Sequence, residues 1–194
     1  MQIIEWPQLL DNGFQLREKF TSMTIGIFDG VHRGHQALME RVVSHNASFV
    51  PAVITFRENH KTNGKEQGKA NYGQSDIQTF PQRLAMLERL GIQITVVIDY
   101  TEEFRRMHGI DFFNILLEHG NVGFFAVGSD FRCGYRLDTD ADTIKKFFIS
   151  HNIPAEIVPQ VMEGSLPISS SRIRAAIASG DLSLAQTMLG YALK

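Results

Sequence analysis

Short apolar runs alternate with longer amphipathic segments along this chain of 194 residues. The runs are typical of strands buried on both faces of a sheet, and the segments between them carry apolar residues at helical spacing. This alternation predicts a single domain, residues 1–194, of the α/β class with a doubly wound, mainly parallel sheet. We expect strands at 23–28, 49–56, 94–98, 124–128 and 155–158, and helices at 35–45, 80–90, 104–119, 142–151, 171–179 and 183–189.

The charge balance and the cysteine count exclude several classes of protein. The 19 Lys and Arg residues against 21 Asp and Glu give a formal net charge of −2, which does not favour nucleic acid or an anionic membrane as partner. No apolar run approaches the roughly 20 residues that cross a bilayer, and the start resembles no signal peptide. Cys133 is the one cysteine, so an internal disulfide is excluded. We expect a cytoplasmic protein.

One segment, 60–76, breaks the alternation. Its sequence HKTNGKEQGKANYGQSD is polar, contains three glycines and has almost no apolar residue. A loop of this length inside a compact domain is either a functional lid or a mobile insertion.

The stretch TIGIFDGVHRGHQALM predicts a strand, a glycine turn and a helix. Gly30 and Gly34 let the backbone turn sharply and approach a ligand, and the amides that open the helix suit a phosphate. His32 and His35 flank the second glycine, so both imidazoles can face one anion at the carboxyl end of the first strand. Histidine there can stabilise charge in a phosphoryl-type transition state.

Other interpretations of this turn stay open at this point. Two histidines three residues apart are often unrelated surface residues. They could also bind a metal with Asp29 as a third ligand, although a glycine between them suits close backbone approach better. The turn lacks both the Gly-Lys-Ser/Thr of a Walker A loop and the Gly-x-Gly-x-x-Gly of a dinucleotide site.

The later stretch ISSSRIR predicts a second anion site. Ser169, Ser170 and Ser171 offer hydroxyls and an N-cap at a helix start. Arg172 and Arg174 would lie in the first turn, where cations oppose the helix dipole, which suggests a bound anion. The alternative is an ordinary serine cap with solvated arginines.

The stretch VGSDFRCG ends a strand in a turn that carries Asp130. Asp130 either contacts nucleotide or closes an Asx turn. We expect Cys133 to form a pocket wall rather than act as a nucleophile. The remaining histidines, His45, His108, His119 and His151, are expected at the surface or at helix ends.

These motifs together resemble a known family. His32-Arg33-Gly34-His35 is similar to the His-x-Gly-His signature of the nucleotidylyltransferase superfamily. GIFDGVHRGHQ closely resembles the opening motif of bacterial FAD synthetases, the FMN adenylyltransferase module of bifunctional riboflavin kinase/FAD synthetase. ITFRENH, VGSDFRCG and ISSSRIRAAIASGDLSLAQTMLG resemble later segments of that family in order and spacing.

The resemblance implies a Rossmann-like nucleotidylyltransferase fold and transfer of AMP from ATP to FMN, giving FAD and pyrophosphate. It implies catalytic roles for His32, His35 and Arg174, with Ser170, Ser171 and Arg174 holding the β and γ phosphates. The ATP site would comprise Gly26, Phe28, Asp29, Gly30, Gly34, Gly128, Asp130, Ser169, Ser170, Ser171 and Arg174. The flavin site would comprise Phe56, Glu58, Asn59, His60 and Phe131. Mg²⁺ would accompany ATP, with Asp29 as the nearest acidic residue to organise it.

The sequence departs from the family pattern in three places. Glu58-Asn59-His60 replaces Pro-His-Pro in the flavin loop, and the added carboxylate is expected to repel the FMN phosphate. The alternative is that His60 performs the role of the family histidine from one position later. Ser129 and Cys133 replace glutamate and phenylalanine. The chain stops within five residues of Leu189-Gly190, so no riboflavin kinase domain or activity is expected.

Three functions therefore compete. The first is FMN adenylyltransferase. The second keeps the ATP site but uses another small phosphate ester as acceptor. The third is a non-catalytic nucleotide or flavin sensor, against which both histidines and ISSSRIR argue.

Overall fold

The computed structural model describes residues 1–16, 19–57 and 76–193. Its main sheet has six strands in this part of the chain, in the order β1-β4-β3-β2-β5-β8, and every pairing within it is parallel. The strands are β1 (Gln2–Glu5), β2 (Thr21–Ile25), β3 (Val50–Phe56), β4 (Ile94–Ile98), β5 (Val122–Gly128) and β8 (Ala155–Val158). The predicted doubly wound α/β fold is confirmed.

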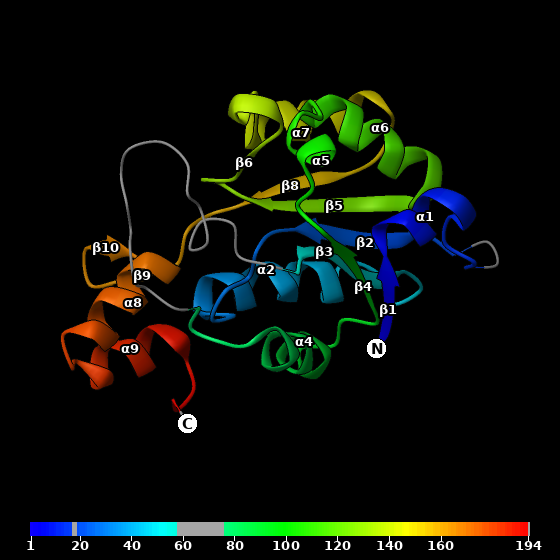
Figure 1. Cartoon of the computed structure of the whole chain (residues 1–194). Coiled ribbons are helices and arrows are strands. Elements are labelled where there is room, and N and C mark those ends of the chain that lie inside the picture. The colour runs from blue at the N-terminus through cyan, green and yellow to red at the C-terminus, as the bar shows by residue number, and fades with distance from the viewer. Residues whose placement is uncertain (17–18, 58–75, 194) are drawn as a thin grey trace.

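Helices cover both faces of the sheet (Figure 1). One face carries α2 (Arg33–Ser44) and α4 (Phe80–Arg89), and the other carries α1 (Trp6–Asn12), α6 (Gly109–His119) and α7 (Ala141–Ser150). The sheet is buried between them, and β2, β3 and β4 expose no residue on either face. Such double burial explains why these strands appear in the sequence as continuous apolar runs.

A smaller unit lies beyond the carboxyl ends of the strands (Figure 1). It consists of the hairpin β9 (Met162–Glu163) and β10 (Leu166–Pro167), followed by α8 (Ser170–Ala178) and α9 (Leu182–Leu189). The two helices share their own apolar cluster, which includes Ile173 and Met188. A second hairpin, β6 (Arg132–Cys133) and β7 (Thr139–Asp140), encloses a 3-10 turn at Tyr135–Leu137.

The prediction of one helix over 104–119 is wrong. The chain forms α5 (Glu102–Arg105), turns, and begins α6 at Gly109. A Cβ atom at Gly109 would lie 2.3 Å from the Thr139 hydroxyl, so β7 packs directly against the backbone there. The Asp138 carboxylate accepts the Gly109 N–H at 3.1 Å and so caps α6 from about 30 residues away.

Smaller differences concern the ends of elements. The strand expected over 23–28 ends at Ile25, and the helix expected from residue 35 begins at Arg33. Neither β1 and α1 nor the two short hairpins were predicted. The predicted loop 60–76 lies, except for Asp76, outside the described residues. Within the described ranges, no helix combines the length and the apolar character needed to cross a membrane.

Candidate active site

A cavity of about 570 Å³ opens at the carboxyl ends of β2 and β5. This is the point where the strand order of the sheet reverses, and open α/β sheets bind ligands there. The residues predicted from the sequence that line the cavity are Gly26, Phe28, Asp29, His32, Gly34, His35, Phe56, Gly128, Asp130, Phe131, Ser169, Ser170, Ser171 and Arg174. Glu58, Asn59 and His60 lie outside the described residues, and Gly30 does not line the cavity.

The turn between β2 and α2 has an unusual backbone. Phe28, Gly30 and Val31 have φ angles of 56°, 78° and 31°, a region that side chains disfavour. At Gly30 a Cβ atom would also lie 2.9 Å from the Ile77 side chain, so this position favours glycine. Non-glycine residues in this region persist where the surrounding structure holds them, often at functional sites.

The two histidines of the turn are stacked. Their ring centroids lie 3.6 Å apart with an interplanar angle of 17°, and the buried Phe28 ring meets the edge of His35 at 5.3 Å. His32 Nδ1 accepts the backbone N–H of His35 at 3.3 Å and so caps α2. The structure therefore brings both imidazoles to one point of the cavity.

Gly34 has a function different from the one expected. It lies in the first turn of α2 and not in the bend before it. A Cβ atom there would come within 3.2 Å of His32 Cε1 and Nδ1, so the glycine leaves room for the His32 ring.

The His32 side chain is electrically neutral at physiological pH. Burial lowers the pKa of His32 to about 4, although Asp130 opposes the shift. Because Nδ1 accepts the His35 N–H, the proton of the neutral ring lies on Nε2. His32 can thus donate one hydrogen bond from Nε2 without carrying a charge.

This low pKa predicts a pH-dependent stability. The unfolded chain protonates His32 near pH 6.5, whereas the native protein does so near pH 4, where the pKa of His32 lies. Acidification from about pH 6.5 to 4 therefore favours the unfolded state, by about 3 kcal/mol at the lower end. His32→Asn keeps a capping acceptor but has no group that titrates in this range. Between pH 7 and pH 4, the free energy of unfolding of this variant should therefore fall by about 3 kcal/mol less than that of the wild type. Urea titrations of both proteins measure this, and parallel pH curves would contradict it.

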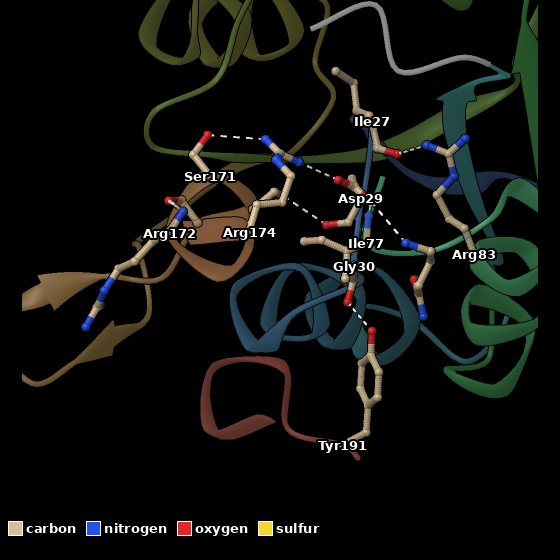
Figure 2. A network of polar contacts seen from close by, with 12 residues as sticks. Ile27, Asp29, Gly30, Ile77, Arg83, Ser171, Arg172, Arg174 and Tyr191 are labelled. Carbon is tan, nitrogen blue, oxygen red and sulfur yellow. Dashed lines mark hydrogen bonds and ion pairs between the residues drawn. The ribbon is translucent and has the colours of Figure 1, made fainter. Parts of the chain in front are cut away.

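The start of α8 faces the histidine turn. Ser169 caps the helix by accepting the Arg172 N–H at 3.2 Å, and the Ser170 hydroxyl donates to the Asp29 carbonyl at 2.8 Å. The Arg174 guanidinium pairs with Asp29 Oδ2 at 2.5 Å and reaches Ser171 Oγ at 3.3 Å (Figure 2). Serine hydroxyls, helix amides and a guanidinium thus face the cavity from one side.

Arg172 does not face the cavity. Its guanidinium donates to the carbonyls of Glu163 and Leu166 at 3.0 and 2.9 Å, in the β9–β10 hairpin. The expected bound anion is therefore not needed to compensate Arg172, because these carbonyls accept its hydrogen bonds.

Asp29 connects three segments of the chain. Its Oδ1 accepts the backbone N–H groups of Ile77 and Gln78 at 2.9 and 3.4 Å, while Oδ2 binds Arg174 (Figure 2). Burial and the nearby Asp76 raise the pKa of this carboxyl, against the lowering effect of Ile77 N–H and Arg174. Both oxygens have protein partners, and no group of three candidate metal ligands occurs within the described ranges. The interpretation of Asp29 as a metal ligand stays a prediction.

The other end of the cavity is aromatic, and most of this wall was missed in the sequence. Phe56 lies 5.8 Å from Tyr100 and 5.9 Å from Phe104, edge to face, and Met107 completes the surface. Such a surface fits a flat aromatic ligand. The available signal was Tyr100, which follows β4 at the same edge of the sheet.

Cys133 lies in the cavity wall, as expected. Burial, reinforced by Asp138, raises the pKa of its thiol to about 12, so the sulfur is a protonated wall atom and not a nucleophile. His45, His108 and His151 are exposed, and the half-buried His119 ends α6, which agrees with the sequence prediction.

Comparisons with known proteins agree with this geometry. Residues 15–172 match the family model described as FAD synthetase. The chain is 28% identical over 171 residues to the bifunctional riboflavin kinase/FMN adenylyltransferase of Escherichia coli (strain K12), covering 87% of this chain and 54% of that protein. It is 28% identical over 175 residues to the protein of the same name from Pseudomonas fluorescens, covering 86% and 53%. The chain spans about half the length of these curated relatives.

A solved structure shares the fold. The crystal structure described as a macrolide-efflux protein from Streptococcus pneumoniae matches 100% of this chain and 72% of that chain. The TM-score is 0.83 and the sequence identity is 26%.

Proposed function

This chain belongs to the FAD synthetase family, and from that premise we propose that it transfers the AMP moiety of ATP to FMN, producing FAD and pyrophosphate. The observation that carries the proposal is the stacked pair His32 and His35, which faces the start of α8 across one cavity. The proposal keeps the sequence-based predictions that both substrates are small molecules and that the reaction takes place in the cytoplasm.

The reaction needs no covalent intermediate on the protein. A phosphate oxygen of FMN forms a bond to the α-phosphorus of ATP, and the bond from that phosphorus to the bridging oxygen of the β-phosphate breaks. His32, neutral and protonated on Nε2, donates a hydrogen bond to the charge that develops on the α-phosphate, and His35, stacked beside it, acts as a second donor to the same charge. His32 acts by position and electrostatics, because a ring with a pKa of about 4 is not protonated at neutral pH and cannot serve as a general acid.

The leaving pyrophosphate would lie at the start of α8. The Ser171 hydroxyl and the helix amides provide donors there, and Arg174 provides a positive charge. The Ser170 hydroxyl, which donates to the Asp29 carbonyl, would hold the helix start against the histidine turn. Arg174 lines the cavity with a planar guanidinium, whose fork of N–H groups matches the geometry of phosphate oxygens.

Mg²⁺ enters this proposal as part of the substrate MgATP. It would neutralise charge on the phosphates and orient them. The isoalloxazine ring of FMN would pack at the aromatic end of the cavity, against Phe56, Phe104 and Phe131.

The proposal is tested by incubating the purified protein with FMN and MgATP and separating the products by chromatography. We expect FAD and pyrophosphate in equal amounts, and no pyrophosphate when FMN is left out. Riboflavin, which lacks the attacking phosphate, is the matched control acceptor and should give no product. Pyrophosphate release with another phosphate ester, but not with FMN, would replace the acceptor in this proposal. ATP binding without turnover of any acceptor would favour a sensor.

A further inference from the structure

The carbonyl groups of the histidine turn, residues 27–31, all accept hydrogen bonds. Ile27 O accepts from Arg83, a buried arginine on α4, and Phe28 O accepts the Val31 N–H at 3.1 Å. The next three carbonyls each accept from a side chain: Asp29 O from Ser170 at 2.8 Å, Gly30 O from Tyr191 at 2.6 Å and Val31 O from Gln36 at 2.8 Å. Backbone with disfavoured φ angles is thus held at every carbonyl, and Figure 2 shows the bonds from Arg83 to Ile27 and from Tyr191 to Gly30.

Tyr191 reaches the turn from the other end of the sequence. Helix α9 ends at Leu189, and Gly190, with φ 78°, reverses the chain in a left-handed C-cap. The Tyr191 ring then packs against the apolar cluster of α8 and α9, and its hydroxyl donates to Gly30 O, 161 residues away. This residue lies beyond 15–172, the part that matches the family model.

The Tyr191 hydroxyl stays protonated, and so stays a hydrogen-bond donor, at physiological pH. Burial and the charge of Asp29 raise the pKa of the Tyr191 hydroxyl to about 12, so the proton remains on the oxygen. The Leu189 carbonyl also accepts from Gln36 at 2.8 Å, so the end of α9 is bonded to α2 while Tyr191 is bonded to the turn before it.

We propose that Tyr191 is a positioning residue for the adenylyl transfer, because its hydrogen bond to Gly30 O holds the turn from which His32 and His35 project. Gly30 lies between Asp29, which binds Arg174, and the two histidines. A movement of its peptide group changes the place of the imidazoles relative to Arg174. Tyr191 itself touches no reacting atom, so its loss affects the reaction through the histidines. This inference rests on the proposed function.

Tyr191→Phe tests the inference, because it removes the hydroxyl and keeps the ring. One lost hydrogen bond of this kind predicts a kcat about fivefold to tenfold lower, with KM for ATP within about twofold of the wild type. The imidazole ¹⁵N resonances of His32 and His35 should move as well, in protein labelled at histidine. The matched control is Tyr135→Phe, in which the tyrosine lies on the exposed 3-10 turn.

The two readouts separate this inference from the function on which it rests. If the wild type makes no FAD, the proposed function fails, and moved imidazole resonances in Tyr191→Phe alone would still support the positioning of the turn. Resonances that stay in place would overturn the inference, even with a lower melting temperature, because Tyr191 would then stabilise the fold without orienting the histidines. A kcat within twofold of the wild type in an active enzyme would overturn it too.

Discussion

Replacing His35 with alanine is expected to lower kcat for FAD formation by about 100- to 1,000-fold, the usual cost of removing a donor that stabilises charge in a transition state. The His35 ring stacks on His32 at 3.6 Å and contacts the Phe28 ring edge to face. Its loss therefore removes one imidazole from the cavity and takes away the stacking contact of the His32 ring. KM for ATP should change much less, because the phosphates are proposed to bind at α8 and Arg174 and not at this ring. Initial rates at saturating FMN and MgATP measure both constants.

The matched control for this variant is His151→Ala. His151 is exposed at the end of α7, and it bonds to Phe147 O of its own helix at 2.8 Å. We expect its kcat to match that of the wild type. A kcat for His35→Ala within threefold of the wild type, in a protein with an unchanged circular dichroism spectrum, would exclude His35 from the chemistry.

The parts of this site that the sequence predicted are local in sequence. The pair His32 and His35, the glycines around it and the serine cap of α8 each depend on residues within about four positions of one another. The parallel sheet was also predictable, because strands buried on both faces appear as apolar runs. With the sheet known, the carboxyl ends of β2 and β5 identified the position of the cavity.

The remaining parts depend on contacts between distant residues. Asp29 and Arg174 are 145 positions apart, and nothing near either residue in the sequence indicates the pair. The break before α6 depends on Asp138 and Thr139, while the apolar spacing on both sides of it continues as in one helix. The role of Tyr191 depends on a C-cap that returns the chain to Gly30. The local sequence does not predict such contacts.

Arg174→Ala is expected to have the largest effect on stability and a large effect on activity. Asp29 is 3% exposed and would lose the guanidinium that balances its charge. Removal of one partner of a buried ion pair typically costs about 3 to 5 kcal/mol of unfolding free energy. The same substitution removes the positive charge proposed to bind the leaving pyrophosphate, so kcat/KM for ATP should fall by about 100- to 1,000-fold.

The double variant Asp29→Asn/Arg174→Ala separates the two effects. Asparagine keeps an oxygen that can accept the Ile77 N–H but has no charge to balance, so we expect it to recover at least half of the lost unfolding free energy in urea titrations. The activity should stay as low as in Arg174→Ala, because both proteins lack the guanidinium proposed to bind the leaving pyrophosphate. If the double variant regained the activity as well, Arg174 would serve only to neutralise Asp29, and the phosphate site at α8 would depend on its amides and serines. The comparison therefore decides whether this arginine acts on the protein alone or on the substrate as well.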